Sequence, residues 1–355
     1  MNVANRGPGI GHECRGSQAV QPTLLRSLIA RSVMALGLIL GATVAAGMPV
    51  IIGAQPASAS NARVSRPGTW SSTGILGSHR GATGSSMIAR TTATGGYDLV
   101  GSDGGVFVFG QPHMGFYGSL PGIGVHVNNI VGIVASYNDQ GYFLVGSDGG
   151  VFAFGDTFFA GSLPGIHVHV NNIVGIVASS DDKGYFLVGS DGGVFGFGDA
   201  HYEGSLPGSG ITVNDVIGIA ATPTNAGYWM VENNGMIWNF GDALAAQRLV
   251  CNDPNGCFRL VGIAATNVLG QQGFWIVDQA GDVFNFGNAG YFGNLPNDNV
   301  NVTNIVSLVP TADDGGYWMI GSDGGVFGFG DASYIGSLPS IGVHVNNIVG
   351  AVPTA

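Results

Sequence analysis

The chain has 355 residues, of which 63 are Gly, 45% are hydrophobic and only 9% are charged, and its formal net charge is −11. The hydrophobic content is too high for a disordered Gly-rich polymer, and an acidic surface disfavours nucleic acid and anionic lipid as partners. Gly recurs at fixed positions, as in turns, and long stretches of helix-forming residues are missing after residue 60. We therefore predict an all-β protein.

The first 59 residues have the order of a secretory signal peptide. Arg26 and Arg31 precede an apolar run over residues 33–52, and small residues follow up to a cleavage site after Ala59. The alternative is a retained membrane anchor, because the run is near the length that spans a bilayer. Cleavage removes four Arg and one Glu, which leaves 7 basic and 21 acidic residues and a net charge of −14. We expect a secreted or cell-surface protein whose mature chain is not embedded in the membrane.

A repeat occupies residues 86–355, after a polar segment at 60–85 that we interpret as a linker or a closing strand. Each unit starts a hairpin with a Gly-aromatic pair, and successive aromatic residues are 45, 43, 43, 46 and 43 positions apart. These aromatic residues are Tyr97, Tyr142, Tyr185, Tyr228, Phe274 and Tyr317. A period in the low forties with four strand-like segments per unit is typical of propeller blades.

The second unit shows the four segments, which we name A to D. Segment A covers 130–136, B covers 142–146, C covers 151–155 and D covers 158–162. Segment A is the most uniformly apolar, so we expect it to line the central axis, and residues 147–150 (SDGG) form the B–C turn. We predict a β-propeller of six complete four-stranded blades. A β-solenoid is the less favoured alternative, because its rungs repeat every 20 to 30 residues.

The sequence does not determine how the ring of blades closes. A seventh A segment covers 348–353, and a strand near Ile75 could join it in a partial seventh blade. Six blades, seven blades or a truncated gene all remain compatible with this pattern.

The fourth unit departs from the repeat and carries the two Cys of the mature chain. Cys251 and Cys257 are separated by the turn-forming residues NDPNG, so we predict that they form a disulfide in an oxidising compartment. Closure of this loop would stabilise the fold by roughly 2 kcal/mol. A metal site is the less favoured alternative, because no further Cys is present in the mature chain.

The motifs GYFLVGSDGGVFAFGD, FxGSLPG and VNNIVGIVAS together resemble the tandem repeats of many secreted proteins from high-GC Gram-positive bacteria, often written GYWLVASDGGVFAFGDA. More distantly they resemble NHL and kelch-type repeats. The resemblance covers about residues 86–355. It implies a β-propeller outside the cell, and it implies no reaction and no catalytic residues.

The sequence supplies no catalytic, cofactor-binding or metal-binding constellation, and we predict none. Recognition is expected at one rim, because B–C turns and D–A loops emerge on the same face of a four-stranded meander. The acids and histidines there have turn-forming and loop roles as their more ordinary interpretation. The rim residues are Asp103, Asp148, Asp191 and Asp323 in the turns, His126, His169 and His344 in the loops, and Asn128, Asn171 and Asn346 beside them.

These features favour a secreted, monomeric, non-enzymatic propeller that binds an extracellular protein or a cell-wall glycan. The alternatives are a carbohydrate-active hydrolase or lyase with a site in the central channel, and a multivalent lectin. Function depends on sites and not on the fold, so the repeat only indicates where to look.

Overall fold

The computed structural model describes residues 95–110, 115–249, 259–267 and 270–354. The chain divides into two compact units, 1–82 and 83–355, and all described residues belong to the second. The predicted signal peptide with Ala59, the segment 60–85, and Cys251 and Cys257 lie outside the described residues. Among the described residues, no helix has the length and hydropathy needed to span a bilayer.

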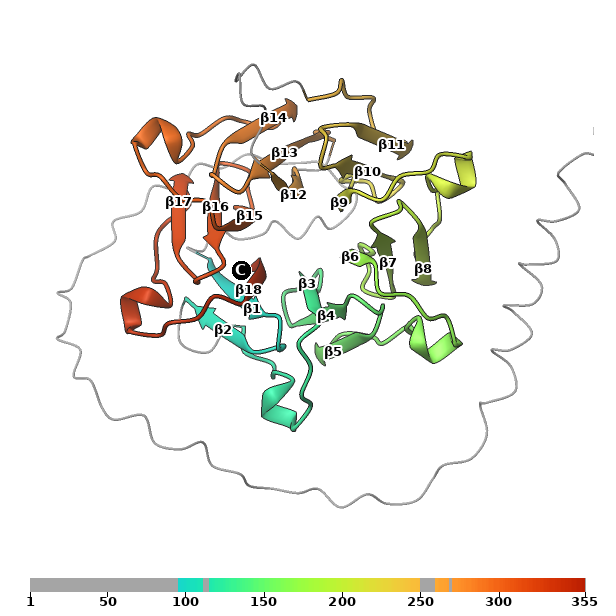
Figure 1. Cartoon of the computed structure of the whole chain (residues 1–355), viewed down its shortest axis with the longest axis horizontal. Coiled ribbons are helices and arrows are strands. Elements are labelled where there is room, and N and C mark those ends of the chain that lie inside the picture. Colours follow the sequence, from blue (N-terminus) through green and yellow to red (C-terminus); the bar gives the residue numbers. More distant parts are fainter. Residues whose placement is uncertain (1–94, 111–114, 250–258, 268–269, 355) are drawn as a thin grey trace, which may run out of the picture. The chain divides into compact units, whose positions relative to one another are not determined.

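The described residues form six antiparallel sheets of three strands each, arranged as blades around a central axis (Figure 1). The inner strands correspond to segment A and are β3 (Ile130–Ala135), β6 (Ile173–Ala178), β9 (Val216–Ala221), β12 (Leu260–Ala265), β15 (Ile305–Pro310) and β18 (Ile348–Thr354). The middle strands are β1 (Gly96–Gly101), β4 (Gly141–Gly146), β7 (Gly184–Gly189), β10 (Gly227–Glu232), β13 (Gly273–Asp278) and β16 (Gly316–Gly321). The outer strands are β2 (Val106–Phe109), β5 (Val151–Gly155), β8 (Val194–Gly198), β11 (Ile237–Gly241), β14 (Val283–Gly287) and β17 (Val326–Gly330).

Burial explains why each middle strand is apolar at almost every position. All six residues of every middle strand are buried, since both faces of the strand pack against neighbouring blades. Each inner strand contacts the inner strands of the two neighbouring blades, so segment A lines the central axis as predicted. The core is therefore a series of inter-blade clusters and not one central cluster.

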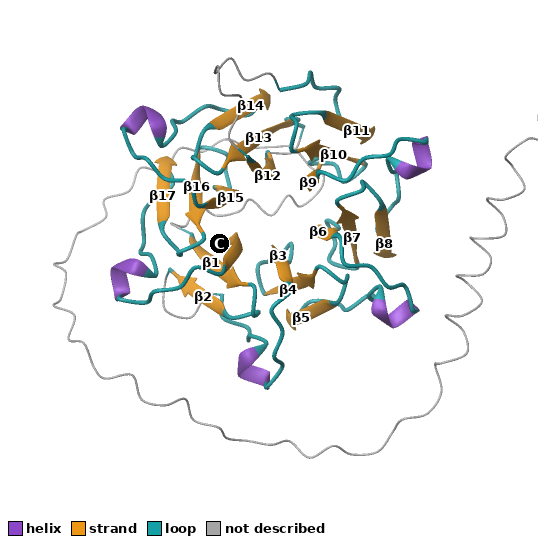
Figure 2. Ribbon diagram, in the orientation of Figure 1, coloured by secondary structure: helices purple, strands orange, loops and turns teal. Residues whose placement is uncertain are grey.

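The predicted fourth strand of each blade is wrong. Segment D, 158–162 in the second unit, forms no ladder with β5 and has no regular structure (Figure 2). Its Gly161 has a φ of 132°, and an added Cβ would lie 2.9 Å from the ring of Phe197 in the next blade. The segment therefore crosses to the neighbouring blade, where its backbone contacts side chains, and its hydrogen bonds are not available to β5.

The hydroxyl of a middle-strand Tyr fixes this crossing. Tyr228 donates a hydrogen bond to the Gly204 carbonyl at 2.5 Å and accepts one from the Glu203 N–H at 3.2 Å. Tyr97, Tyr142, Tyr185 and Tyr317 make the same bond to Gly336, Gly118, Gly161 and Gly293 of their preceding blades. The fifth blade has Phe274 at this position, and the blade before it lacks the Gly-Ser-Leu-Pro sequence that supplies the carbonyl. The Tyr hydroxyl thus links each of these blades to the preceding one.

Loss of these inter-blade hydrogen bonds should lower the free energy of unfolding by a measurable amount. We expect Tyr228→Phe to lower the free energy of unfolding by about 1–2 kcal/mol, because a carbonyl and an N–H in a partly buried seam lose their partner. Chemical denaturation of the purified protein measures the difference. The control is Tyr202→Phe, which removes an exposed hydroxyl that bonds only locally to Ser205 and should change stability by less than about 0.5 kcal/mol. Equal costs in the two variants would contradict the inter-blade role.

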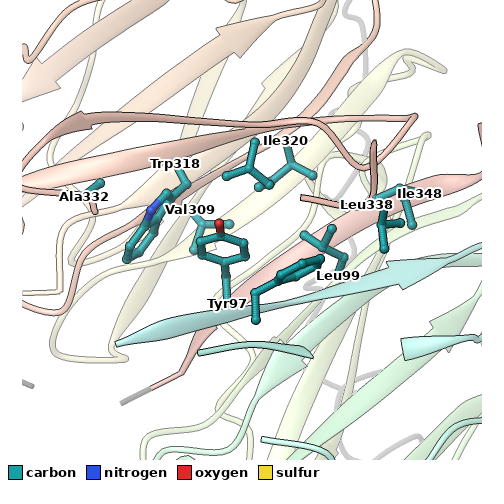
Figure 3. Packing of buried hydrophobic residues seen from close by; sticks show 10 residues of the cluster. Tyr97, Leu99, Val309, Trp318, Ile320, Ala332, Leu338 and Ile348 are labelled. Carbon is teal, nitrogen blue, oxygen red and sulfur yellow. The ribbon is translucent and has the colours of Figure 1, made fainter. Parts of the chain in front are cut away.

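The first blade closes the ring with strands from distant parts of the chain. Its sheet has the order β18-β1-β2, and β18 pairs antiparallel with β1, with Gly96 opposite Thr354. The last A segment therefore completes the first blade and belongs to no seventh blade among the described residues. Tyr97 and Leu99 of β1 pack against Trp318 and Leu338 of the sixth blade at this seam (Figure 3). The ring closes with six sheets.

Candidate functional site

The B–C turns and the loops before the inner strands lie on one face of the ring. The N–H of Ser147 in the second blade's turn donates to the Asn129 carbonyl at 2.8 Å, and the Ile173 N–H of the third blade donates to the Ser147 carbonyl at 3.0 Å. The same pair of bonds recurs at Ser102, Ser190 and Ser322. Each turn is thus held between the loop of its own blade and the inner strand of the next, so the predicted rim residues share a face.

The Asp residues of this rim stabilise the turns themselves. In each of four blades the Asp carboxylate accepts a hydrogen bond of 3.0 Å from the N–H two residues later. These residues are Asp103, Asp148, Asp191 and Asp323. Asp103 also accepts a bond of 3.4 Å from Asn347, which immediately precedes the first blade's inner strand. The carboxylates therefore have a structural task, which is the more ordinary interpretation of their pattern.

Two irregular blades keep an oxygen acceptor at this turn by another route. In the fifth blade Ala280 replaces the turn Asp, and Asp278 at the end of β13 accepts the N–H groups of Ala280 and Asp282, both at 2.9 Å. In the fourth blade Asn234 accepts the Met236 N–H at 2.8 Å. In regular blades the residue equivalent to Asp278 is Gly146, where an added Cβ would lie 2.5 Å from the Asp148 carboxylate. The same space is filled from either position.

The His and Asn residues of the rim are exposed and occupy three consecutive blades. His344, His126 and His169 precede β18, β3 and β6, the inner strands of the first, second and third blades. Asn128, Asn171 and Asn346 are exposed beside them. Across the described residues, no three His, Cys, Asp or Glu side chains gather in a way that could hold a metal ion. These His and Asn side chains offer polar contacts on one half of the ring.

A second repeated surface was missed by the sequence analysis. Segment D of five blades carries one large aromatic side chain, between 45% and 60% exposed, two residues before its Gly. These residues are Phe116, Phe159, Tyr202, Tyr291 and Tyr334, and we call them the aromatic series. The pattern FxGSLPG contained the signal, but a D strand would have placed alternate side chains against a neighbouring sheet. Because segment D is irregular, these rings remain at the surface.

Short 3-10 helices at the outer edge of the ring accompany the aromatic series (Figure 2). They are η2 (Pro121–Ile123), η3 (Pro164–Ile166), η4 (Pro207–Ser209), η5 (Pro296–Asp298) and η6 (Pro339–Ile341). Hydrogen bonds of 3.0 Å join Tyr202 to Ser205, Tyr334 to Ser337 and Asn297 to Tyr291. Exposed Ile side chains occupy the end of η2, η3 and η6. The patches of Tyr202, Tyr291 and Tyr334 therefore combine an aromatic ring with hydroxyl or amide groups.

The opposite face, which carries the A–B turns, has a cleft of about 330 Å³ between the third and fourth blades. Asp181, Asp199 and His201 line it together with Thr224 of the next blade. The hydrogen bond from Lys183, 2.8 Å from Asp181, lowers the pKa of that carboxyl to about 2, so it is a poor proton donor near neutral pH. His201 contacts Glu203 at 2.6 Å.

Comparison with known proteins places the fold. No family model matches the sequence, and no curated protein matches it. Among solved structures, a chain from the crystal structure of a nidogen/laminin complex matches with a TM-score of 0.50. The match covers 73% of this chain and 98% of that chain at 10% sequence identity. The described domain has a β-propeller fold. At this identity the propeller's likeness to nidogen concerns the fold alone.

Proposed function

We propose that this propeller is a non-enzymatic binding module that acts outside the cell, on a protein or a glycan at the cell wall. The observation that carries the proposal is the aromatic series, in which equivalent positions of five blades expose a large ring. Single exposed apolar residues are ordinary on protein surfaces, whereas this series places a large exposed ring at the same structural position of five blades. Aromatic side chains supply much of the binding energy at recognition surfaces.

The geometry of the series favours a partner that is contacted at several equivalent points. Tyr202, Tyr291 and Tyr334 each lie next to a hydroxyl or amide group, so their patches can combine apolar contact with hydrogen bonds. Repeated weak patches on one rigid ring add through multivalency, because a second contact to the same polymer becomes intramolecular. A multivalent lectin, with a glycan as the polymer, is one form of this proposal, and an extended protein is the other.

Other parts of the proposal rest on different observations. The matched chain was solved in a nidogen/laminin complex, which makes a protein partner reasonable, although the likeness is one of fold. Export rests on the leader at residues 1–59, and the Cys251–Cys257 disulfide rests on the spacing and the exported context. We also propose that the propeller acts as a monomer.

The aromatic series can be tested by comparing two matched triple variants. We expect Phe159→Ser, Tyr202→Ser and Tyr334→Ser together to weaken binding to isolated cell walls, or to the best target on a glycan or protein array, by about tenfold or more. The thermal unfolding midpoint should change little, because the rings are exposed. The matched variant carries His126→Ala, His169→Ala and His344→Ala on the rim and should retain its affinity.

A loss of affinity in the histidine variant alone would indicate that the binding site lies on the rim. Digestion of a bound glycan by the wild-type protein would instead favour the carbohydrate-active enzyme.

A further inference from the structure

The A–B turns of neighbouring blades are joined by a hydrogen bond at two junctions of the ring. Asp182 of the third blade accepts the Tyr137 N–H of the second blade at 2.6 Å, and Asp314 of the sixth blade accepts the Asn267 N–H of the fifth at 2.8 Å. Both acids hold the same position in their turns, with a φ of 60°. Each bond therefore links two turns across a blade junction.

The junction between the third and fourth blades has the same two positions without the bond. Asn225 of the fourth blade, with a φ of 55°, is the equivalent of Asp182, and Ser180 of the third blade is the equivalent of Tyr137. Among the described residues, neither the Ser180 N–H nor the Asn225 side chain has a hydrogen-bond partner. Both residues line the cleft of about 330 Å³ instead. A backbone donor and a side-chain amide are thus available on walls that come from different blades.

The rest of the cleft combines apolar and polar groups. Phe186, which is almost wholly buried, and Ala200 supply apolar surface, and Asp199 and His201 supply polar side chains. His201 uses Nδ1 in its contact with Glu203 at 2.6 Å, so its Nε2 remains available. The volume lies at the lower end of the range for small-molecule sites, about 300–1,000 Å³. The cleft therefore has room for one sugar-sized unit and not for a folded partner.

We propose that this cleft binds one N-acetylhexosamine unit of a glycan through its acetamido group. The acetamido carbonyl would accept the Ser180 N–H, its N–H would donate to the Asn225 side-chain oxygen, and its methyl group would face Phe186. Sugar hydroxyls can donate to the Asp199 carboxylate and bond to the His201 ring. An amide of the ligand would thereby replace the bond that joins the turns elsewhere. This inference rests on the proposed function, because it names the glycan chemistry that the propeller would bind.

Charge in the cleft narrows the class of sugar. Asp181 and Asp199 are among the described residues that line it, whereas no Arg or Lys is, and Lys183 at 2.8 Å neutralises Asp181 alone. The remaining negative charge disfavours an acidic sugar. A cationic amine could pair with Asp199, but it has no acceptor to offer the Ser180 N–H. A neutral, N-acetylated sugar satisfies both walls.

The experiment titrates the full secreted protein with N-acetylglucosamine and, in parallel, with glucose and glucosamine. We expect N-acetylglucosamine to bind with a Kd of about 1 mM, and the other two sugars to bind at least about tenfold more weakly, because they leave the amide groups of the site unpaired. In two-dimensional NMR spectra, the Ser180 backbone amide and the Asn225 side-chain amide should shift with the concentration of N-acetylglucosamine.

Two variants and a matched control assign the site. Ser180→Pro removes the N–H, and the fourth blade already has Pro223 at the equivalent position, so the fold should be retained. Asn225→Asp supplies the acid that accepts the neighbouring N–H at other junctions, so it should occupy the Ser180 N–H in place of the ligand. Each should weaken binding by about tenfold or more. The control is Asp314→Asn, at the equivalent turn position two blades further, which should retain the wild-type affinity.

The proposal is overturned if N-acetylglucosamine binds no better than glucose, if glucosamine binds more tightly than either, or if Ser180→Pro retains the wild-type affinity. Such a failure is distinguishable from a failure of the proposed function. The aromatic series is tested on isolated cell walls and arrays, whereas this cleft is tested with a monosaccharide in solution.

Discussion

Replacing Asp98 by Asn should raise the free energy of unfolding by about 2–4 kcal/mol at pH 7.5. The reason is that the folded protein must hold this carboxyl in a buried site where Oδ1 has no hydrogen-bond partner. An Asn side chain has nearly the same shape and carries no charge. Urea denaturation of wild type and variant at fixed pH measures the difference.

The same prediction can be tested through the pH dependence of the free energy of unfolding, whose direction follows from the raised pKa of Asp98. The pKa of Asp98 is about 8 in the folded protein against 3.8 for an ordinary Asp, so between these values the folded state holds a proton that the unfolded state has lost. Stability from this group is therefore complete below about pH 4 and is lost progressively as the pH rises through 8. Asp98→Asn should remove this decline. An unchanged slope between pH 6 and 8 would show that Asp98 does not titrate there.

Asp278 provides a matched control for that measurement. Burial raises its pKa to about 6, in the same direction as Asp98 but over a lower pH range, and backbone N–H groups oppose the shift. Asp278→Asn keeps an oxygen that can accept those N–H groups. It should flatten the decline between about pH 4 and 6 and leave the decline between pH 6 and 8 in place.

Removing β18 should unfold the propeller. A chain that ends at Asn347 loses the inner strand of the first blade, including the buried side chains of Ile348 and Val352. The remaining β1-β2 hairpin would have an unpaired edge on the axis. The inner strands of the neighbouring blades, β3 and β15, would each lose their contact with β18. We expect a loss comparable to the whole stability of a domain, about 5–15 kcal/mol. Far-UV circular dichroism and limited proteolysis would detect it.

A rearranged chain tests whether closure itself is responsible. Residues 343–354 can be moved in front of residue 95 and joined to it by a turn copied from residues 136–140. The ends to be joined are close, because the Gly96 N–H donates to the Thr354 hydroxyl at 3.0 Å. This variant should recover a cooperative unfolding transition. A cooperative transition in the truncated chain, without the transplanted strand, would mean that the ring does not need β18.

The sequence was sufficient for the parts of this fold that depend on local pattern. The repeat period located segments A, B and C, and the uniformly apolar A segment is the inner strand of each blade. The turn chemistry of Asp148 and its equivalents also followed from their Asp-Gly-Gly context, because such bonds form within a few residues. The aromatic residue that begins segment B located every middle strand.

Tertiary structure decided the features that depend on partners distant in the chain. Segment D has the composition of a strand, but its Gly161 carbonyl bonds to Tyr185 of the next blade, so no fourth ladder forms. The same contact leaves the aromatic series exposed. The replacement of Tyr by Phe274 after a unit without Gly-Ser-Leu-Pro was the one trace of this tie in the sequence.

Ring closure and the burial of Asp98 in β1 show the same limit most clearly. Gly96 and Thr354 are 258 positions apart, and no local pattern states that they pair. In a strand of six residues, a single Asp such as Asp98 looks like an ordinary interruption of an apolar segment. Its burial, the lack of a hydrogen-bond partner at its Oδ1 and its place near Asp139 arise only when the two ends of the repeat array meet. The physical reason is that local sequence determines strand and turn preferences, whereas the burial of a charge depends on every element that surrounds it.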